Sequence, residues 1–253
     1  PPRSTPKPSS AASDVYKRQF LVNIDTSFNV YTDTPKGRDP DSHSPTLRNY
    51  HKFLWSKKLP NGLLFKLDET IPMRLHHKSD LGEFVLSSDS IAHTYSNIKS
   101  TTNIIKKIDT KELEKFVSLC STIGGYIIFP SERINNQMTI NGARGVNKKI
   151  RDRFDLTLEC IRRYYIKEDS PLNETFERYK QFFNLFESFQ GYVDFFLLQD
   201  LVSNDYSSIK YFIPFKSFEN YPLPNDIEEY KQYKYNLSNF VLARSQRMNN
   251  LDK

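Results

Sequence analysis

Aromatic residues are concentrated in the C-terminal half of the chain, and their spacing there is helical. Of the 35 Phe, Tyr and Trp residues, 21 lie between positions 164 and 240. Phe176, Tyr179, Phe183 and Phe186 recur about every 3.5 residues, which places their rings on one face of a helix. We therefore interpret the aromatic residues as the core of a helical part and not as a surface for stacking nucleobases.

Apolar stripes and capping residues predict five helices from about residue 109 onwards. Asp109 and Glu112 have the spacing of a capping box, and the pair Gly124 and Gly125 is typical of a helix end. Leu158 lies in the middle of the second apolar stripe and is expected to be buried. The expected helices cover about 109–123, 147–166, 171–190, 192–202 and 225–248.

Short apolar runs rich in β-branched residues predict strands. We expect them within 20–31, 63–65, 83–86, 126–129, 138–140 and 206–215. Residues 32–48 hold three prolines and many short polar side chains, so we expect a long loop there, of the kind that often carries function. The whole pattern predicts an α+β fold, in which a β-rich N-terminal third packs against a helical C-terminal part.

The first 19 residues, PPRSTPKPSSAASDVYKRQ, have no hydrophobic pattern and resemble translated sequencing-adapter read-through. We therefore expect residues 1–19 to form a disordered tail and residues 20–253 to form a single α+β domain. The tail carries a formal charge of +3, half of the total of +6. The remaining positive charge is ordinary for an intracellular domain and does not by itself indicate a nucleic-acid partner.

Several classes of protein are excluded by composition. No apolar run approaches the roughly 20 residues of a membrane span, and the tail lacks the apolar segment of a secretory signal. The only cysteines, Cys120 and Cys160, are too few for a disulfide scaffold or a four-thiolate zinc site. Their places on apolar helical faces predict core positions. We expect a soluble cytoplasmic protein without contact to a membrane.

Three separated blocks of sequence are similar to an uncharacterised bacterial family. The blocks are FNVYTDTPKGRDPDSHSPTLRNYHKFLW at 28–55, MTINGARGVNKKIRDRFDLTLECIRRYY at 138–165 and FESFQGYVDFFLLQDLV at 186–202. The resemblance extends over most of residues 28–248 and implies one full-length domain found in bacteria and mobile elements. It implies no activity, so no catalytic role is carried over to this chain.

Histidines and aspartates gather in the N-terminal third. All five histidines lie within 51 consecutive residues, among several aspartates. Imidazole and carboxylate groups are ligands for Zn²⁺, Mn²⁺ or Fe²⁺, and Asp39, Asp41 and His43 lie close together on the predicted loop. These three are therefore candidate ligands of a divalent metal. The spacing matches no metal motif, and the alternative is that the histidines cap, pack or face water.

The segment Asn141-Gly142-Ala143-Arg144-Gly145 lies between a predicted strand and a predicted helix start. Its glycines allow a ligand to approach the backbone, and a helix N-terminus favours anions. Arg144 can hold a phosphate or carboxylate with two hydrogen bonds, and Lys148 is nearby. The alternative is a turn in which Arg144 pairs with an internal acid. If this segment binds an anion, the residues expected to contact it are Arg144, Gly142, Gly145 and Lys148.

Three carboxylates, Asp152, Asp155 and Glu159, are spaced to share one face of the predicted second helix. Grouped carboxylates bind Mg²⁺ or Mn²⁺ in phosphoryl chemistry, and Asp152 and Glu159 join Asp41 and His43 as candidate catalytic residues. The alternative is a lattice of ion pairs with the arginines of the same helix. If the wide apolar stripe buries this helix, some of these charges need internal partners.

Three functions are compatible with these patterns. The leading hypothesis is a domain that binds a phosphorylated or other anionic ligand, including nucleic acid, through Arg144. The second is a metal-dependent hydrolase or nuclease that uses Asp41 and His43. The third is a protein-interaction module whose long last helix docks a partner. Salt-dependent binding, metal content and concentration-dependent mass would separate the three.

Overall fold

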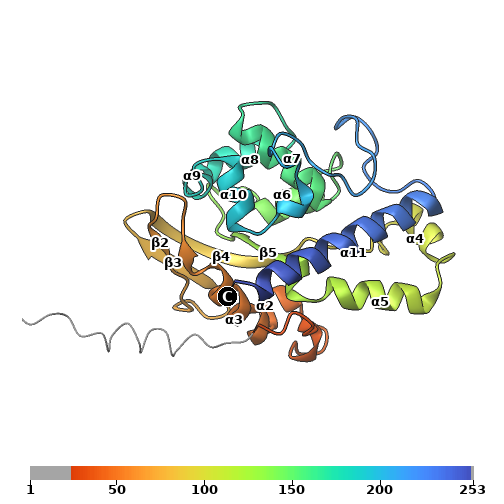
Figure 1. Ribbon diagram of the computed structural model, residues 1–253, viewed down its shortest axis with the longest axis horizontal. Helices are drawn as coiled ribbons and strands as arrows, with labels where there is room; N and C mark the ends of the chain where they lie inside the picture. Colours follow the sequence, from red (N-terminus) through yellow and green to blue (C-terminus); the bar gives the residue numbers. More distant parts are fainter. Residues whose placement is uncertain (1–23, 252–253) are drawn as a thin grey trace, which may run out of the picture.

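Strand β4 (Gly82–Ser90) is the centre of the main sheet. It pairs antiparallel with β3 (Leu75–Ser79) on one side and with β5 (Tyr126–Pro130) on the other. A second sheet consists of two short antiparallel strands, β1 (Lys57–Lys58) and β2 (Leu64–Phe65). These facts come from a computed structural model that describes residues 24–251 (Figure 1). The tail expected at residues 1–19 lies outside the described residues.

Helices surround the main sheet. Figure 1 shows α6 to α10 gathered above β5, while α11 and α5 run side by side below this group of helices. The helical elements are η1 (Val30–Thr32), α2 (Pro40–His43), α3 (Pro45–Trp55), α4 (Lys99–Ile105), α5 (Thr110–Cys120), η2 (Ile123–Gly125), α6 (Ile140–Val146), α7 (Phe154–Tyr165), α8 (Asn173–Arg178), α9 (Lys180–Asn184), α10 (Phe189–Phe195), η3 (Gln199–Leu201) and α11 (Ile227–Asn249). The expected α+β class, with strands in the N-terminal part and a helical C-terminal part, is confirmed.

The aromatic side chains pack in the core of the helical part, as their spacing predicted. Phe176, Phe183 and Tyr192 are completely buried. The Phe176 and Phe183 rings lie 4.8 Å apart at an edge-to-face angle, the arrangement that aromatic quadrupoles favour. Leu158 in α7 is also completely buried, and Cys120 and Cys160 are buried free thiols, so these three expected core positions are confirmed.

Several expected elements are confirmed with small changes of boundary. The Asp109 side chain accepts a hydrogen bond from the Glu112 backbone N–H at 3.1 Å and begins α5. Strand β5 covers the run expected at 126–129, and α11 covers the last helix expected at 225–248. No helix within residues 24–251 combines the length and the apolarity that crossing a bilayer requires.

Around Arg144 the expected secondary structure is wrong. Residues 138–140 form no strand, because the Thr139 hydroxyl caps a helix by accepting from the Gly142 N–H at 3.2 Å. Gly142, Arg144 and Gly145 therefore lie inside α6 and not on a turn. The helix expected at 147–166 begins only at Phe154 in α7, because the two residues at 151–152 have left-handed backbone conformations that no helix continues through.

Further expected elements are shorter than the patterns suggested. The loop expected at 32–48 contains α2 and the start of α3, each opened by a proline at its first turn. Residues 24–31 form turns and η1, and the expected start of that strand at 20–23 lies outside the described residues. The helix expected at 171–190 is divided into α8 and α9, with α10 beginning at its end, and 192–202 holds the rest of α10 followed by η3. Residues 206–215 contribute one isolated bridge.

Candidate functional site

The C-terminal end of β4 meets three polar segments from elsewhere in the chain. Helix α2 packs against β4, and it forms because Asp39 caps it by accepting from the Asp41 N–H at 3.0 Å. This short helix carries the Asp41 side chain next to Ser88 and Asp89 of β4. Helix α6 and the segment before α7 supply the remaining side chains. Sequence positions 41, 89, 144 and 152 therefore meet in one place.

Arg144 is the centre of this group and is completely buried. Its Nη1 is hydrogen-bonded and ion-paired with the Asp89 carboxylate, and its Nη2 lies 3.1 Å from Asp152 Oδ1. Its Nε donates to the Thr157 hydroxyl at 3.0 Å. The guanidinium also lies over the Phe129 ring, with Cζ 5.5 Å from the ring centroid. Two carboxylates and an aromatic face thus stabilise a cation that is removed from water.

Asp152 connects Arg144 to a histidine. Its Oδ2 lies 3.2 Å from Nε2 of His93, which follows β4 in the chain. Asp152 has a left-handed backbone with φ of 61°, and this conformation turns the chain between α6 and α7. We define the Arg144 cluster as the six residues Asp41, Ser88, Asp89, His93, Arg144 and Asp152.

The carboxyls of the cluster differ in protonation. Burial raises the pKa of Asp41 to about 8, the charges of Asp89 and Asp39 add to this rise, and Ser88 and Arg144 oppose it. Burial also raises the pKa of Asp89, while the Arg144 guanidinium opposes that rise. Since the charge of Asp89 helps to keep the proton on Asp41, the cluster holds a protonated Asp41 beside an ionised Asp89 just above neutral pH.

The cluster is open to solvent at its carboxylates although its arginine is not. The side chains of Asp89, Asp152 and His93 are 15%, 23% and 28% exposed. Burial lowers the pKa of His93, while the nearby Asp152 opposes this effect, so the imidazole is neutral at neutral pH. A protonated carboxyl, a carboxylate and a neutral imidazole are groups that donate and accept protons in general acid–base catalysis.

Of the candidate catalytic residues, Asp41 and Asp152 lie in the cluster and two others do not. His43 ends α2, where its Nδ1 lies 3.1 Å from the Asp39 carbonyl oxygen. Glu159 accepts from Arg162 and Arg163 on α7, so an ion-pair lattice does form at this position. Asp155 is buried against Arg153 and does not share a helix face with Asp152.

The predicted anion contacts occupy different environments. The Arg144 guanidinium faces Asp89 and Asp152, which is the internal pairing considered as the alternative. Gly142 donates to the cap of α6, and a Cβ added at Gly145 would lie 4.0 Å from Asp152 Oδ2. The role of these residues in binding an anion stays a prediction. Asp89 and His93 entered the sequence analysis only as members of a region rich in Asp and His, because nothing local links them to Arg144.

No metal centre is assembled in the part of the chain that the structure describes. Within residues 24–251, no three or more His, Cys, Asp or Glu side chains are grouped so that they could hold an ion. Asp39 caps α2 and is exposed, while Asp41 faces β4, so the candidate ligands Asp39, Asp41 and His43 have separate roles in this geometry.

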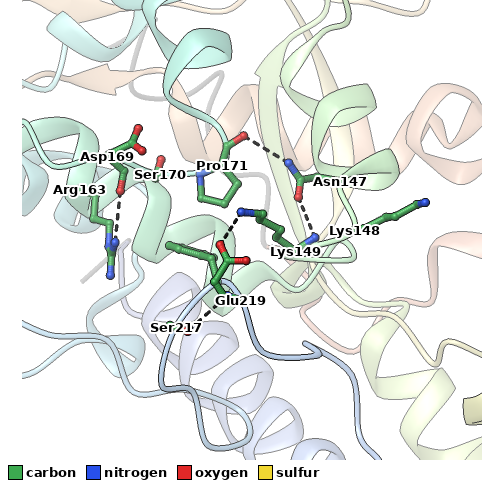
Figure 2. A pocket seen from close by; sticks show the side chains of 10 residues that line it. Asn147, Lys148, Lys149, Arg163, Asp169, Ser170, Pro171, Ser217 and Glu219 are labelled. Carbon is green, nitrogen blue, oxygen red and sulfur yellow. Dashed lines mark hydrogen bonds and ion pairs between the residues drawn. The ribbon is translucent and has the colours of Figure 1, made fainter.

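Lys148 lines a hollow of about 590 Å³ next to α7 (Figure 2). Lys149 and Arg163 also line it, but both are engaged. Lys149 Nζ lies 2.6 Å from Glu219 Oε1, and Arg163 Nη1 donates to the Asp169 carbonyl at 3.2 Å. Figure 2 shows the Lys148 side chain extending away from the other labelled side chains. The hollow therefore combines three cations with the carboxylates of Asp169 and Glu219.

Comparisons with known proteins place the chain in a family. No curated protein and no solved structure matches it. One family model matches residues 24–248, almost all of the residues that the structure describes. The resemblance to a family without an assigned activity is thereby confirmed, and the matched range holds every member of the Arg144 cluster. The chain belongs to DUF6994, a family of unknown function.

Proposed function

We propose that the Arg144 cluster is a hydrolytic site that cleaves a glycosidic bond by general acid–base catalysis. The observation that carries the proposal is the convergence of Asp41 and Asp89 beside a buried arginine, which is ion-paired with Asp89, while burial raises the pKa of Asp41. Two carboxyl groups in opposite protonation states are what glycoside hydrolysis requires. The proposal retains Asp41 and Asp152 from the predicted hydrolase and adds Asp89 and His93.

The roles follow from the protons that each group holds. The Asp41 carboxyl gives its proton to the leaving atom as the bond from that atom to the anomeric carbon breaks. The Asp89 carboxylate takes a proton from water, whose oxygen forms the new bond to the anomeric carbon. Asp89 then holds a proton taken from the attacking water, Asp41 is ionised, and proton exchange with solvent restores both groups. Arg144 and Asp152 fix Asp89 and His93 around the reacting atoms.

An exposed aromatic ring supports a sugar or nucleoside as the substrate. Tyr31 in η1 is 56% exposed. Burial of its hydroxyl and the charges of Asp39 and Asp41 raise the pKa of Tyr31, so the proposed acid acts on this hydroxyl electrostatically. Aromatic faces pack against the apolar faces of sugars and bases, while carboxylates accept hydrogen bonds from their hydroxyls.

A hydrolysis screen tests the proposal. The protein is incubated with nitrophenyl glycosides and with nucleosides, and the release of nitrophenol or free base is measured between pH 5 and 9. We expect a bell-shaped rate profile, with an acidic limb from Asp89 and an alkaline limb from Asp41 near its pKa of about 8. Asp41→Asn and Asp89→Asn should each lower the rate by about 10²-fold or more.

Asp80→Asn is the matched control for these variants, because it removes an exposed carboxyl at the turn between β3 and β4. Its rate should equal that of the wild type. Hydrolysis that survives Asp41→Asn and Asp89→Asn, or a complete absence of hydrolysis across the panel, would reject the proposal.

A second candidate function is the binding of a phosphorylated ligand in the hollow of Figure 2. Its support is the set of three cations, Lys148, Lys149 and Arg163, on one concave surface. The ion pair between Lys149 and Glu219 faces solvent and is easily exchanged for a phosphate, since exposed pairs contribute at most about 1 kcal/mol, whereas Arg163 also pairs with the buried Glu159. This candidate retains Lys148 from the predicted anion site.

A further inference from the structure

A buried hydrogen-bond chain leads from α3 to the Asp41 carboxyl. Trp55 Nε1 donates to His51 Nδ1 at 2.9 Å, and His51 Nε2 lies 2.9 Å from the Ser88 hydroxyl oxygen. Trp55 and His51 are completely buried, and Ser88 is 4% exposed. The Asp41 carboxyl lies next to Ser88, and its Oδ1 is buried without a hydrogen-bond partner. Three residues on α3 and β4 are therefore linked in series, and the last of them lies beside Asp41 of α2.

The donors along this chain run in one direction only. The indole N–H can only donate, so His51 Nδ1 must accept and therefore carries no proton. Burial and the charge of Arg244 lower the pKa of His51 to about 3, so the ring is neutral and its single proton is on Nε2. Nε2 must then donate to the Ser88 oxygen. The proton of the Ser88 hydroxyl is left to point at Asp41.

We propose that Trp55, His51 and Ser88 are positioning residues for Asp41, because they fix the one orientation of the Ser88 hydroxyl in which it donates to that carboxyl. This inference rests on the proposed function, in which Asp41 is the acid. An oriented donor holds the carboxyl in place and steadies the carboxylate that remains after proton transfer. The arrangement resembles the logic of a catalytic triad, in which a buried group sets the tautomer of a histidine.

Other charged and titratable groups also act on Asp41 and must be held constant in a test. They come from its own helix, from both neighbouring strands, from α6 and from η1: Asp39, Asp89, Tyr126, Arg144 and Tyr31. Ser88 is the one uncharged side chain among the groups that shift the pKa of Asp41, and it opposes the effect of burial. Ser88→Ala removes this donor and the acceptor of the His51 Nε2 proton, and it changes no charge.

The test measures the carboxyl and the imidazole directly by NMR in the full chain without substrate. The ¹³C signal of Asp41 is titrated in the wild type, in Ser88→Ala and in the control Ser87→Ala, whose hydroxyl lies on the opposite face of β4. Ser88→Ala should raise the pKa of Asp41 by roughly one pH unit, and Ser87→Ala should leave it unchanged. Equal pKa values in the two variants would overturn the inference.

The ¹⁵N spectrum of His51 gives a second readout that needs no variant. We expect a neutral imidazole with its proton on Nε2 throughout pH 5 to 9, and a proton on Nδ1 would overturn the inference even if Ser88→Ala fails to fold. Neither measurement depends on turnover. Loss of the chain is therefore distinguished from failure of the glycosidic-bond proposal, which the hydrolysis screen alone decides.

Discussion

Arg144 combines a buried charge with partners that lie far apart in the sequence. The sequence analysis identified it as a site residue and considered both an anion and an internal acid as its partner. The structure places two internal acids beside it. Nothing in the sequence could identify Asp89, 55 positions earlier, because only the packing of β4 against α6 brings the pair together.

Arg144→Lys should lower the free energy of unfolding by about 2 kcal/mol, since a single ammonium cannot reach Asp89, Asp152 and Thr157 together. Urea denaturation measures this loss. Arg247→Lys is the matched control, because its partner Asp200 lies on the surface, and its effect should stay below about 1 kcal/mol.

The same variant separates the two interpretations of Arg144. Titration with inorganic phosphate should give equal affinities for the wild type and Arg144→Lys if the guanidinium serves the carboxylates. A ten-fold weaker affinity combined with unchanged stability would instead establish Arg144 as an anion contact. Lys148→Ala, measured in the same titration, reports whether the hollow of Figure 2 binds phosphate.

Among the helices and strands, α7 shows which features the spacing of apolar residues predicts and which it does not. Its apolar stripe correctly places Leu158 in the core, because burial follows from side-chain spacing. The predicted start of this helix lies seven residues too early. Arg151 and Asp152 have a left-handed backbone conformation, which depends on tertiary contacts that the sequence pattern does not contain. A strand was likewise expected at residues 138–140, whereas Thr139 caps α6, which begins at Ile140.

Leu158→Ala should destabilise the protein by roughly 2–5 kcal/mol, because the truncation leaves a cavity in a completely buried position. The control is Leu242→Ala on α11, whose side chain is 48% exposed and whose replacement should cost less than about 0.5 kcal/mol. Chemical denaturation of both variants checks the comparison, and equal midpoints would contradict the burial of the α7 stripe.

At the scale of the whole molecule, the raised pKa of Asp41 predicts how stability depends on pH. The unfolded chain releases this proton near pH 3.8, whereas the folded chain keeps it until about pH 8. Between these values the folded state binds more protons, so the contribution of Asp41 to stability is complete at low pH and is lost as pH rises.

Asp41→Asn should flatten this dependence. Thermal unfolding between pH 5 and 8 should show a melting temperature that falls with pH more steeply in the wild type than in the variant. Folding lowers the pKa of His51, His77 and His93 below 6.5, so these histidines also change the stability in this window. The difference between the two curves is therefore the quantity that isolates Asp41. Parallel curves would show that Asp41 is already ionised in the folded protein.

The fold class could be predicted because it depends on local patterns: aromatic stripes for helices and β-branched runs for the strands. The site could be predicted only in part. Asp41, Asp152 and Arg144 carry recognisable chemistry, so they were found one by one. Their convergence, and the contributions of Ser88, His51 and His93, depend on a sheet register and a helix packing that no short sequence window contains.

The three-way contact among Asp89, Arg144 and Asp152 also constrains how the chain can diverge. A single exchange at position 89 leaves a buried cation with only one of its two counter-charges, and a single exchange at position 144 leaves two acids without the cation between them. Both single substitutions are therefore destabilising, and neither is expected to persist as a neutral intermediate. These three positions are therefore expected to be inherited as a unit, or to be replaced together by an uncharged set, in any lineage that keeps this architecture.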